Sequence, residues 1–97
     1  MKRIHIIISG RVQGVAFRAA TREAAIALNL TGWVKNLRDG QVEAVFEGKD
    51  AQVEIMRRWC EHGPPLARVT GVDLSDENYT GEFLDFTILY GTNKPIP

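Results

Sequence analysis

The chain has 97 residues, of which 44% are hydrophobic and 25% are charged, so it is long enough to bury one core and too short to divide into two. We therefore expect residues 1–97 to form a single domain. The formal net charge is zero, which argues against the broad positive surface of a nucleic-acid-binding protein. One cysteine permits no internal disulfide, and the apolar run near the N-terminus is too short for a signal peptide, so we expect a soluble cytoplasmic protein that does not enter a membrane.

The first third of the chain has the pattern of a strand, a turn and a helix. Residues 4–8 place three isoleucines on one face of a β-branched run, which predicts a first strand. A turn bracketed by Gly10 and Gly14 follows. From Phe17 onwards the apolar residues recur at helical spacing until Asn29, a residue that tolerates the left-handed conformation of a helix end. We expect a helix between these two residues.

The middle of the chain has the pattern of a hairpin followed by a second helix. Residues 32–36 predict a second strand, and the Asp39-Gly40 turn leads into a third. The core face of this third strand is expected to contain Val42, Ala44 and Phe46. Asp50 is expected to be the N-cap of a helix that ends before Gly63. The buried stripe of that helix is expected to contain Val53, Met56 and Cys60.

The last third of the chain predicts two more strands. A fourth strand is expected over residues 67–74, and the break in its alternation indicates a bulge near Gly71. Residues 76–82 form a polar loop. The closing strand alternates with period two, and its apolar residues are Leu84, Phe86, Ile88 and Tyr90.

This order of elements predicts an α+β fold of the ferredoxin-like type, a βαββαβ sandwich with a short additional C-terminal strand. Two helices are expected to pack on one face of a mostly antiparallel sheet. Because a helical crossover normally joins parallel strands, the carboxyl ends of the first two strands should lie at the same sheet edge. The first strand ends in the glycine turn and the second ends at Asn36, so we expect the two to meet.

The glycine turn has the properties of an anion-binding site. Backbone N–H groups around Gly10 and Gly14 can converge on one point, and the first N–H groups of the following helix point there too. Arg18 lies in the first turn of that helix, where a cation opposes the helix dipole unless an anion lies between them. Its planar guanidinium suits a pair of phosphate oxygens.

The same residue types also have simpler interpretations. An isolated arginine such as Arg18 is more often solvated, and an asparagine such as Asn36 more often ends a strand. Their expected closeness to the turn is what favours a function for both. Gln13 is expected to brace the turn through hydrogen bonds, and Arg11 either contacts the anion or faces water. Lys35 should alternate away from Asn36 and face solvent.

The remaining reactive side chains do not predict a metal or nucleophile site. His5 and His62 lie on separate elements, and Cys60 is expected to be a core thiol. The aromatic residues expected to pack in or against the core are Phe17, Trp33 and Trp59. No zinc spacing, Walker lysine or carboxylate pair is present in the sequence, so we expect neither a metal nor a cofactor.

A phosphate site with these groups suits one class of substrate. Expelling an alkoxide from phosphorus normally needs a proton donor or a divalent cation. The leaving group of an acyl phosphate is a carboxylate, which is stable as an anion at neutral pH. Positioning a water molecule and neutralising the phosphoryl oxygens can therefore suffice for hydrolysis.

Two segments also resemble a known family. They are Gly10–Arg18 and Gly32–Asn36, the latter followed by Gly40, Val42 and Gly48 at the family's spacing. Together they closely resemble the acylphosphatases, small enzymes that hydrolyse the carboxyl-phosphate bond. The resemblance covers nearly the whole chain, and only the tail from Gly91 looks individual.

The resemblance implies a role for each residue of the motif. It implies that phosphate is bound by Arg18 and by backbone donors of the loop residues Val12, Gln13, Gly14, Val15, Ala16 and Phe17. It implies that Asn36 orients the attacking water and that Arg18 and Asn36 are the catalytic residues. Family members often have glycine at the position of Ala16, so the alanine is expected to stiffen the loop slightly. Small acyl phosphates are the implied substrates and inorganic phosphate the product, and we expect a monomer.

Two other functions are compatible with the pattern. A non-enzymatic module could keep the phosphate site and sense a phosphorylated metabolite, although the asparagine at the second strand's end argues against it. A ferredoxin-like protein-interaction or RNA module is possible on fold alone. The sequence does not specify which acyl group the enzyme prefers.

Overall fold

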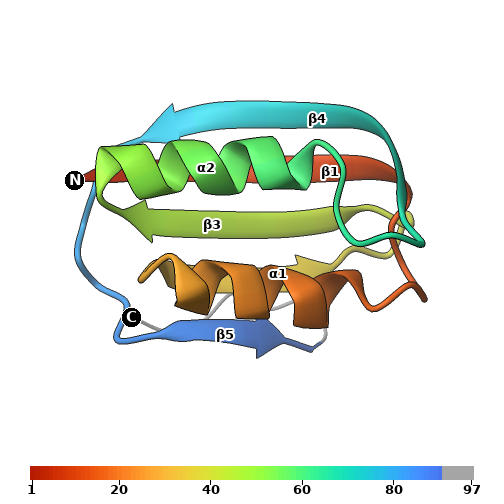
Figure 1. The fold of residues 1–97 in the computed structure, drawn as a ribbon, viewed down its shortest axis with the longest axis horizontal. Helices are drawn as coiled ribbons and strands as arrows, with labels where there is room; N and C mark the ends of the chain where they lie inside the picture. The colour runs from red at the N-terminus through yellow and green to blue at the C-terminus, as the bar shows by residue number, and fades with distance from the viewer. Residues whose placement is uncertain (91–97) are drawn as a thin grey trace.

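The computed structural model describes residues 1–90, which form five strands and two helices in the predicted order (Figure 1). The bounds of the elements are β1 (Lys2–Arg11), α1 (Phe17–Ala27), β2 (Thr31–Asn36), β3 (Val42–Gly48), α2 (Asp50–Cys60), β4 (Arg68–Glu77) and β5 (Phe86–Leu89). The tail from Gly91 lies outside the described residues.

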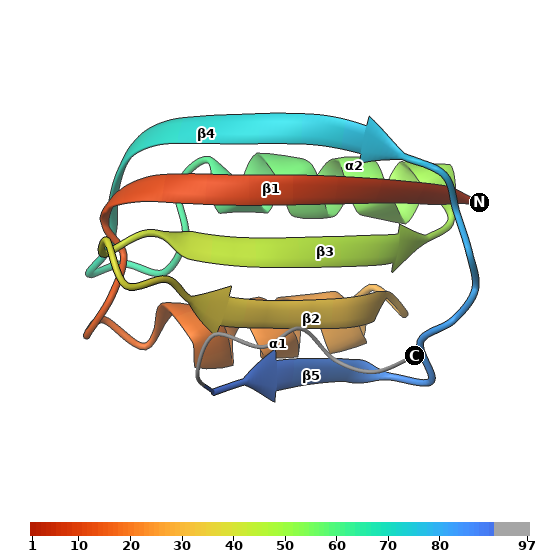
Figure 2. The same ribbon diagram turned by 180° about the vertical axis from the view of Figure 1, so that it is seen from behind.

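The strands form one sheet in the order β4-β1-β3-β2-β5. β1 and β2 both run antiparallel to β3, so they are parallel to each other and their carboxyl ends lie at one edge. β5 pairs with β2 in parallel. Figures 1 and 2 show both helices on the same face of the sheet. The predicted ferredoxin-like α+β fold is therefore confirmed.

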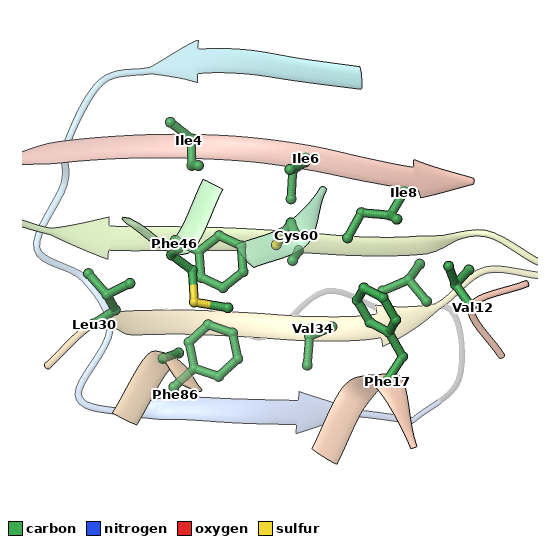
Figure 3. Packing of buried hydrophobic residues seen from close by; sticks show 14 of the residues in the cluster. Ile4, Ile6, Ile8, Val12, Phe17, Leu30, Val34, Phe46, Cys60 and Phe86 are labelled. Carbon is green, nitrogen blue, oxygen red and sulfur yellow. The ribbon is translucent and has the colours of Figure 1, made fainter. Parts of the chain in front are cut away.

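The core lies between this sheet and the two helices (Figure 3). All three predicted sets of core residues are fully buried: Ile4, Ile6 and Ile8 of β1, Val42, Ala44 and Phe46 of β3, and Val53, Met56 and Cys60 of α2. Phe46 stacks on Phe86 of β5 with ring centroids 5.3 Å apart. Phe17 meets Trp59 edge to face, at 5.6 Å. The packing of the core therefore fixes both the start of α1 and the position of β5 within the sheet.

The bulge predicted near Gly71 is present. Ser9 pairs with Gly71 and Gly10 pairs with Val69, which leaves Thr70 as the extra residue. Gly10 has φ +122°, and a Cβ there would lie 2.1 Å from the carbonyl oxygen of Arg68. Only glycine fits this close approach of β1 and β4. The bulge thus shapes the chain just before the turn that links β1 to α1.

Three local predictions were wrong. Lys49 is the N-cap of α2 without a side-chain cap, and Asp50 is the first helical residue, 3.2 Å from the N-terminal ammonium. Leu84 is 98% exposed and precedes β5, because pairing with β2 begins where Gly32 N–H donates to the Asp85 carbonyl. Lys35 is only 3% exposed, although it was predicted to face solvent.

Alternation away from Asn36 predicts that Lys35 faces solvent, and the structure differs. Its ammonium instead lies 3.6 Å from Glu43, its direct partner on β3, and over the ring of Trp33. A lysine can bury its aliphatic stem along an apolar surface when its charged end finds a partner. The opposite charge across the strand pair supplies that partner.

Candidate functional site

A pocket of about 180 Å³ opens at the sheet edge where β1 and β2 end. Its walls are formed by Val12, Gln13, Gly14, Ala16, Phe17, Arg18, Ala19, Asn36, Ile88 and Tyr90. The pocket therefore brings the loop after β1 together with Asn36 at the end of β2, as the crossover argument predicts. Val15 is buried and is absent from the pocket wall.

The loop after β1 enters α1 through two residues with left-handed backbone. Gly14 has φ +74°, and Ala16, the N-cap of α1, has φ 60° and ψ 27°. The helix's hydrogen bonding starts with Ala20 N–H donating to the Ala16 carbonyl. The earlier N–H groups of the first turn have no intrahelical acceptor. Phe17, Arg18 and Ala19 bring these donors to the pocket wall.

Side-chain hydrogen bonds hold this loop in place. The Gln13 amide donates to the backbone carbonyls of Leu37 and Gln41, at 2.7 and 2.9 Å. Gln41 in turn donates to Ser9 Oγ at 2.7 Å. These bonds connect the loop to the β2–β3 hairpin and confirm the bracing role predicted for Gln13. Phe17 anchors the other end of the loop in the core.

Arg18 is half-buried in the pocket wall, while Arg11 is exposed and lies outside it. The guanidinium carbon of Arg18 lies 5.2 Å from the centre of the Tyr90 ring. Within residues 1–90 the guanidinium makes no hydrogen bond or ion pair. Its N–H donors are therefore available to a ligand of the pocket.

Asn36 contributes an unpaired acceptor. Its side-chain oxygen Oδ1 is buried and has no hydrogen-bond partner among the described residues. Leaving a buried polar atom unpaired costs about 1–3 kcal/mol, so such atoms usually have a ligand or water partner. A donor placed in the pocket would satisfy this oxygen.

The other reactive groups lie elsewhere or are blocked. His5 pairs with Glu43 at 2.6 Å, and neither residue lines the pocket. Burial raises the pKa of Cys60 to about 12, so its thiol stays protonated and the prediction of a core thiol is confirmed. Within residues 1–90, no three acidic, histidine or cysteine side chains are grouped so as to hold a metal ion. Among the same residues, neither helix is long and apolar enough to cross a membrane.

The sequence did not identify Ala19, Ile88 or Tyr90 as pocket residues. The alternation of the closing strand did place Ile88 and Tyr90 on one face, and that signal was correct. The sequence does not predict which strand pairs with the closing strand, because a short alternating segment does not specify its partner. Once β5 is paired with β2, its carboxyl end lies beside Asn36.

Comparison with known proteins identifies the family. The acylphosphatase family model matches residues 4–88. Proteins described as acylphosphatases from Syntrophus aciditrophicus and Syntrophobacter fumaroxidans are 53% and 54% identical, and each match covers 93% of this chain and 94% or 93% of the relative. The crystal structure of acylphosphatase from Bacillus subtilis has a TM-score of 0.89 and 34% identity, covering 93% of this chain and 100% of that one. The chain therefore belongs to the acylphosphatase family and is a hydrolase of acyl phosphates.

Proposed function

We propose that the pocket hydrolyses the carboxyl-phosphate bond of small acyl phosphates without a metal ion. Arg18 and the loop residues 12–17 bind the phosphoryl group, and Asn36 orients the attacking water. The observation that carries this proposal is the buried, unpaired Asn36 oxygen in the same pocket as the Arg18 guanidinium and the first-turn N–H groups.

Phosphate binding follows from the charges and donors of the pocket. The Arg18 guanidinium presents paired N–H donors that match two phosphate oxygens. The N–H groups at the start of α1 and the positive end of the helix dipole favour an anion at the same point. These groups neutralise the equatorial oxygens of the transferring phosphoryl group, where charge must be stabilised in the transition state.

Asn36 supplies orientation rather than proton abstraction. Its Oδ1 can accept a hydrogen bond from water, but an amide is too weakly basic to take the proton. In a loose transition state the bond between the water oxygen and phosphorus is little formed, so the water's proton is lost late or passes to the phosphoryl group. Holding the water in line reduces the entropy cost of bringing the reactants together.

The leaving group explains why no acid or metal is required of these residues. The bond between phosphorus and the carboxyl oxygen breaks, and the electron pair stays on a carboxylate that is stable at neutral pH. Water adds a hydroxyl group to phosphorus, so the products are the carboxylate and inorganic phosphate.

We also propose that residues 1–97 act as one monomeric domain in the cytoplasm.

The proposal is tested by hydrolysis of benzoyl phosphate with EDTA present throughout. Wild type is expected to turn over substrate, and Arg18→Ala is expected to lose activity and inhibition by phosphate together. Arg18→Lys should restore little, because an ammonium lacks the bidentate geometry. Arg11→Ala is the matched control, since it removes an equal charge from the exposed end of β1.

Strict metal dependence of the wild type would contradict the proposal. Unchanged phosphate inhibition in Arg18→Ala would remove that residue from the binding site. Phosphate binding without any turnover by folded wild type would instead favour a sensing module.

A further inference from the structure

The pocket has two chemically different sides. One side carries the Arg18 guanidinium, the loop N–H groups and the Asn36 amide. The other wall is formed by Ile88 of β5 and by Tyr90, which follows that strand. The Gln13 amide is already used in bracing the loop, so the Tyr90 hydroxyl is the one further polar side-chain group on the wall formed by the described residues. The second side is therefore mostly apolar.

The position of this apolar side is fixed by β5. Phe86 stacks on Phe46 in the core, and its carbonyl accepts a hydrogen bond from Arg22 of α1 at 3.3 Å. Register with β2 pairs Lys35 with Leu89, so Tyr90 follows beside Asn36. The Tyr90 ring reaches the Arg18 guanidinium at 5.2 Å. The aromatic ring is thus held next to the proposed phosphoryl position.

The direction of attack points the acyl group toward this ring. Asn36 Oδ1 is buried, whereas Tyr90, which also lines the pocket, is 77% exposed. In an in-line displacement the leaving group lies opposite the attacking water. Water held at the buried Asn36 oxygen therefore leaves the acyl group on the solvent side of the phosphoryl group, where Tyr90 is the exposed side chain of the wall. An exposed aromatic face gains stability when an apolar group covers it.

We propose that Ile88 and Tyr90 form the acyl-binding surface, which makes the enzyme favour acyl phosphates with a flat, apolar acyl group over those with a small one. This inference rests on the proposed function, since it needs the phosphoryl group at Arg18. It assigns Tyr90 a specificity role. The cation–π contact with Arg18 needs no hydrogen-bond acceptor, so it leaves the guanidinium's preference for phosphate oxygens intact.

The test compares kcat/KM for benzoyl phosphate and acetyl phosphate in wild type, Tyr90→Ala and Tyr90→Phe. In Tyr90→Ala the ratio of the two values should fall about fivefold, the order expected for one lost aromatic contact. Tyr90→Phe should restore most of the ratio because the ring remains. Tyr79→Ala, the same change on the loop between β4 and β5, should leave the ratio unchanged. Using a ratio cancels any effect that Tyr90 has on phosphate binding through Arg18.

A proportional loss for both substrates would overturn the acyl contact, because Tyr90 would then act through Arg18 alone. An unchanged ratio in Tyr90→Ala would overturn it as well. Failure of the wild type to hydrolyse either substrate would overturn the proposed function, which is a separate result. Thermal unfolding of each variant verifies that the fold is retained, as expected for an exposed side chain beyond the end of β5.

Discussion

Two polar side chains with buried oxygens contrast in how those oxygens are satisfied: Glu47 near the end of β3 and Asn36 of β2, which pairs with the first residue of β3. Glu47 accepts hydrogen bonds from Thr80 N–H and Oγ1 and from Gly81 N–H, at 2.9 to 3.1 Å, and Arg3 lies 3.3 Å away. Asn36, beside the other end of β3, has a buried oxygen with no partner among the described residues. The first arrangement stabilises a loop, and we propose that the second keeps an acceptor for a ligand.

The two arginines nearby show the same contrast. Burial opposes the charge of Arg3, but hydrogen bonds to Glu82, Glu77 and Glu47 outweigh it and raise the pKa of Arg3 above its ordinary value. Within residues 1–90, Arg18 lies over the ring of Tyr90 and forms no ion pair with a carboxylate. An arginine that is hydrogen-bonded to several carboxylates contributes to the stability of the fold. An arginine without an acidic partner is suited to binding an external anion.

Replacing Asn36 is expected to have the largest effect among tests of this contrast. Asn36→Ala should lower kcat by on the order of 100-fold, because a water-positioning group is lost. Inhibition by phosphate should stay near the wild-type level, because Arg18 and the loop remain. Initial rates and phosphate inhibition constants measure both. Wild-type kcat in the variant would make Asn36 a structural residue.

Replacing Glu47 should affect stability and spare the chemistry. Glu47→Ala leaves the N–H groups of Thr80 and Gly81 without their acceptor and removes one partner of Arg3. The free energy of unfolding should fall by about 3 kcal/mol, while activity well below the melting temperature is retained. Urea unfolding measures the change, and Glu61→Ala, at the exposed C-cap residue of α2, is the matched control. An equally small effect for both variants would remove the contrast between the two ends of β3.

Replacing Ala16 should give the smallest effect. Alanine in the left-handed conformation costs roughly 1–2 kcal/mol, which glycine would relieve. Glycine also increases the conformational entropy of the unfolded chain, which offsets about 0.5–1 kcal/mol of that gain. Ala16→Gly is therefore expected to raise the free energy of unfolding by about 0.5 kcal/mol. Asn29→Gly, at φ 57°, is the control and should gain less, because asparagine tolerates this conformation. Destabilisation by Ala16→Gly would show that the loop stores no strain there.

Much of the site could be predicted from local rules. The alternation of residues 4–8 and the helical spacing after Phe17 specify two elements, and the crossover rule then places the two strand ends at one edge. These rules together predict that Arg18 and Asn36 lie close to each other. Their roles stay predictions until variants are measured.

The parts that sequence did not predict depend on partners far along the chain. Lys35 is buried because Glu43 lies opposite it, a pairing that alternation alone does not reveal. Ile88 and Tyr90 reach the pocket because β5 pairs with β2. Leu84 continues the apolar alternation but precedes the paired segment. Register and strand order, rather than residue type, decide these positions.

The central claim is that the end of the sheet at Asn36 binds phosphate while the Glu47 end does not. Titrating the ¹⁵N-labelled protein with inorganic phosphate and following amide shifts by NMR tests it most directly. The amides of residues 13–19 and the Asn36 side-chain amide should shift with one saturation curve, while those of Thr80 and Gly81 stay fixed. Shifts at Thr80 and Gly81 with none in the loop would contradict the account.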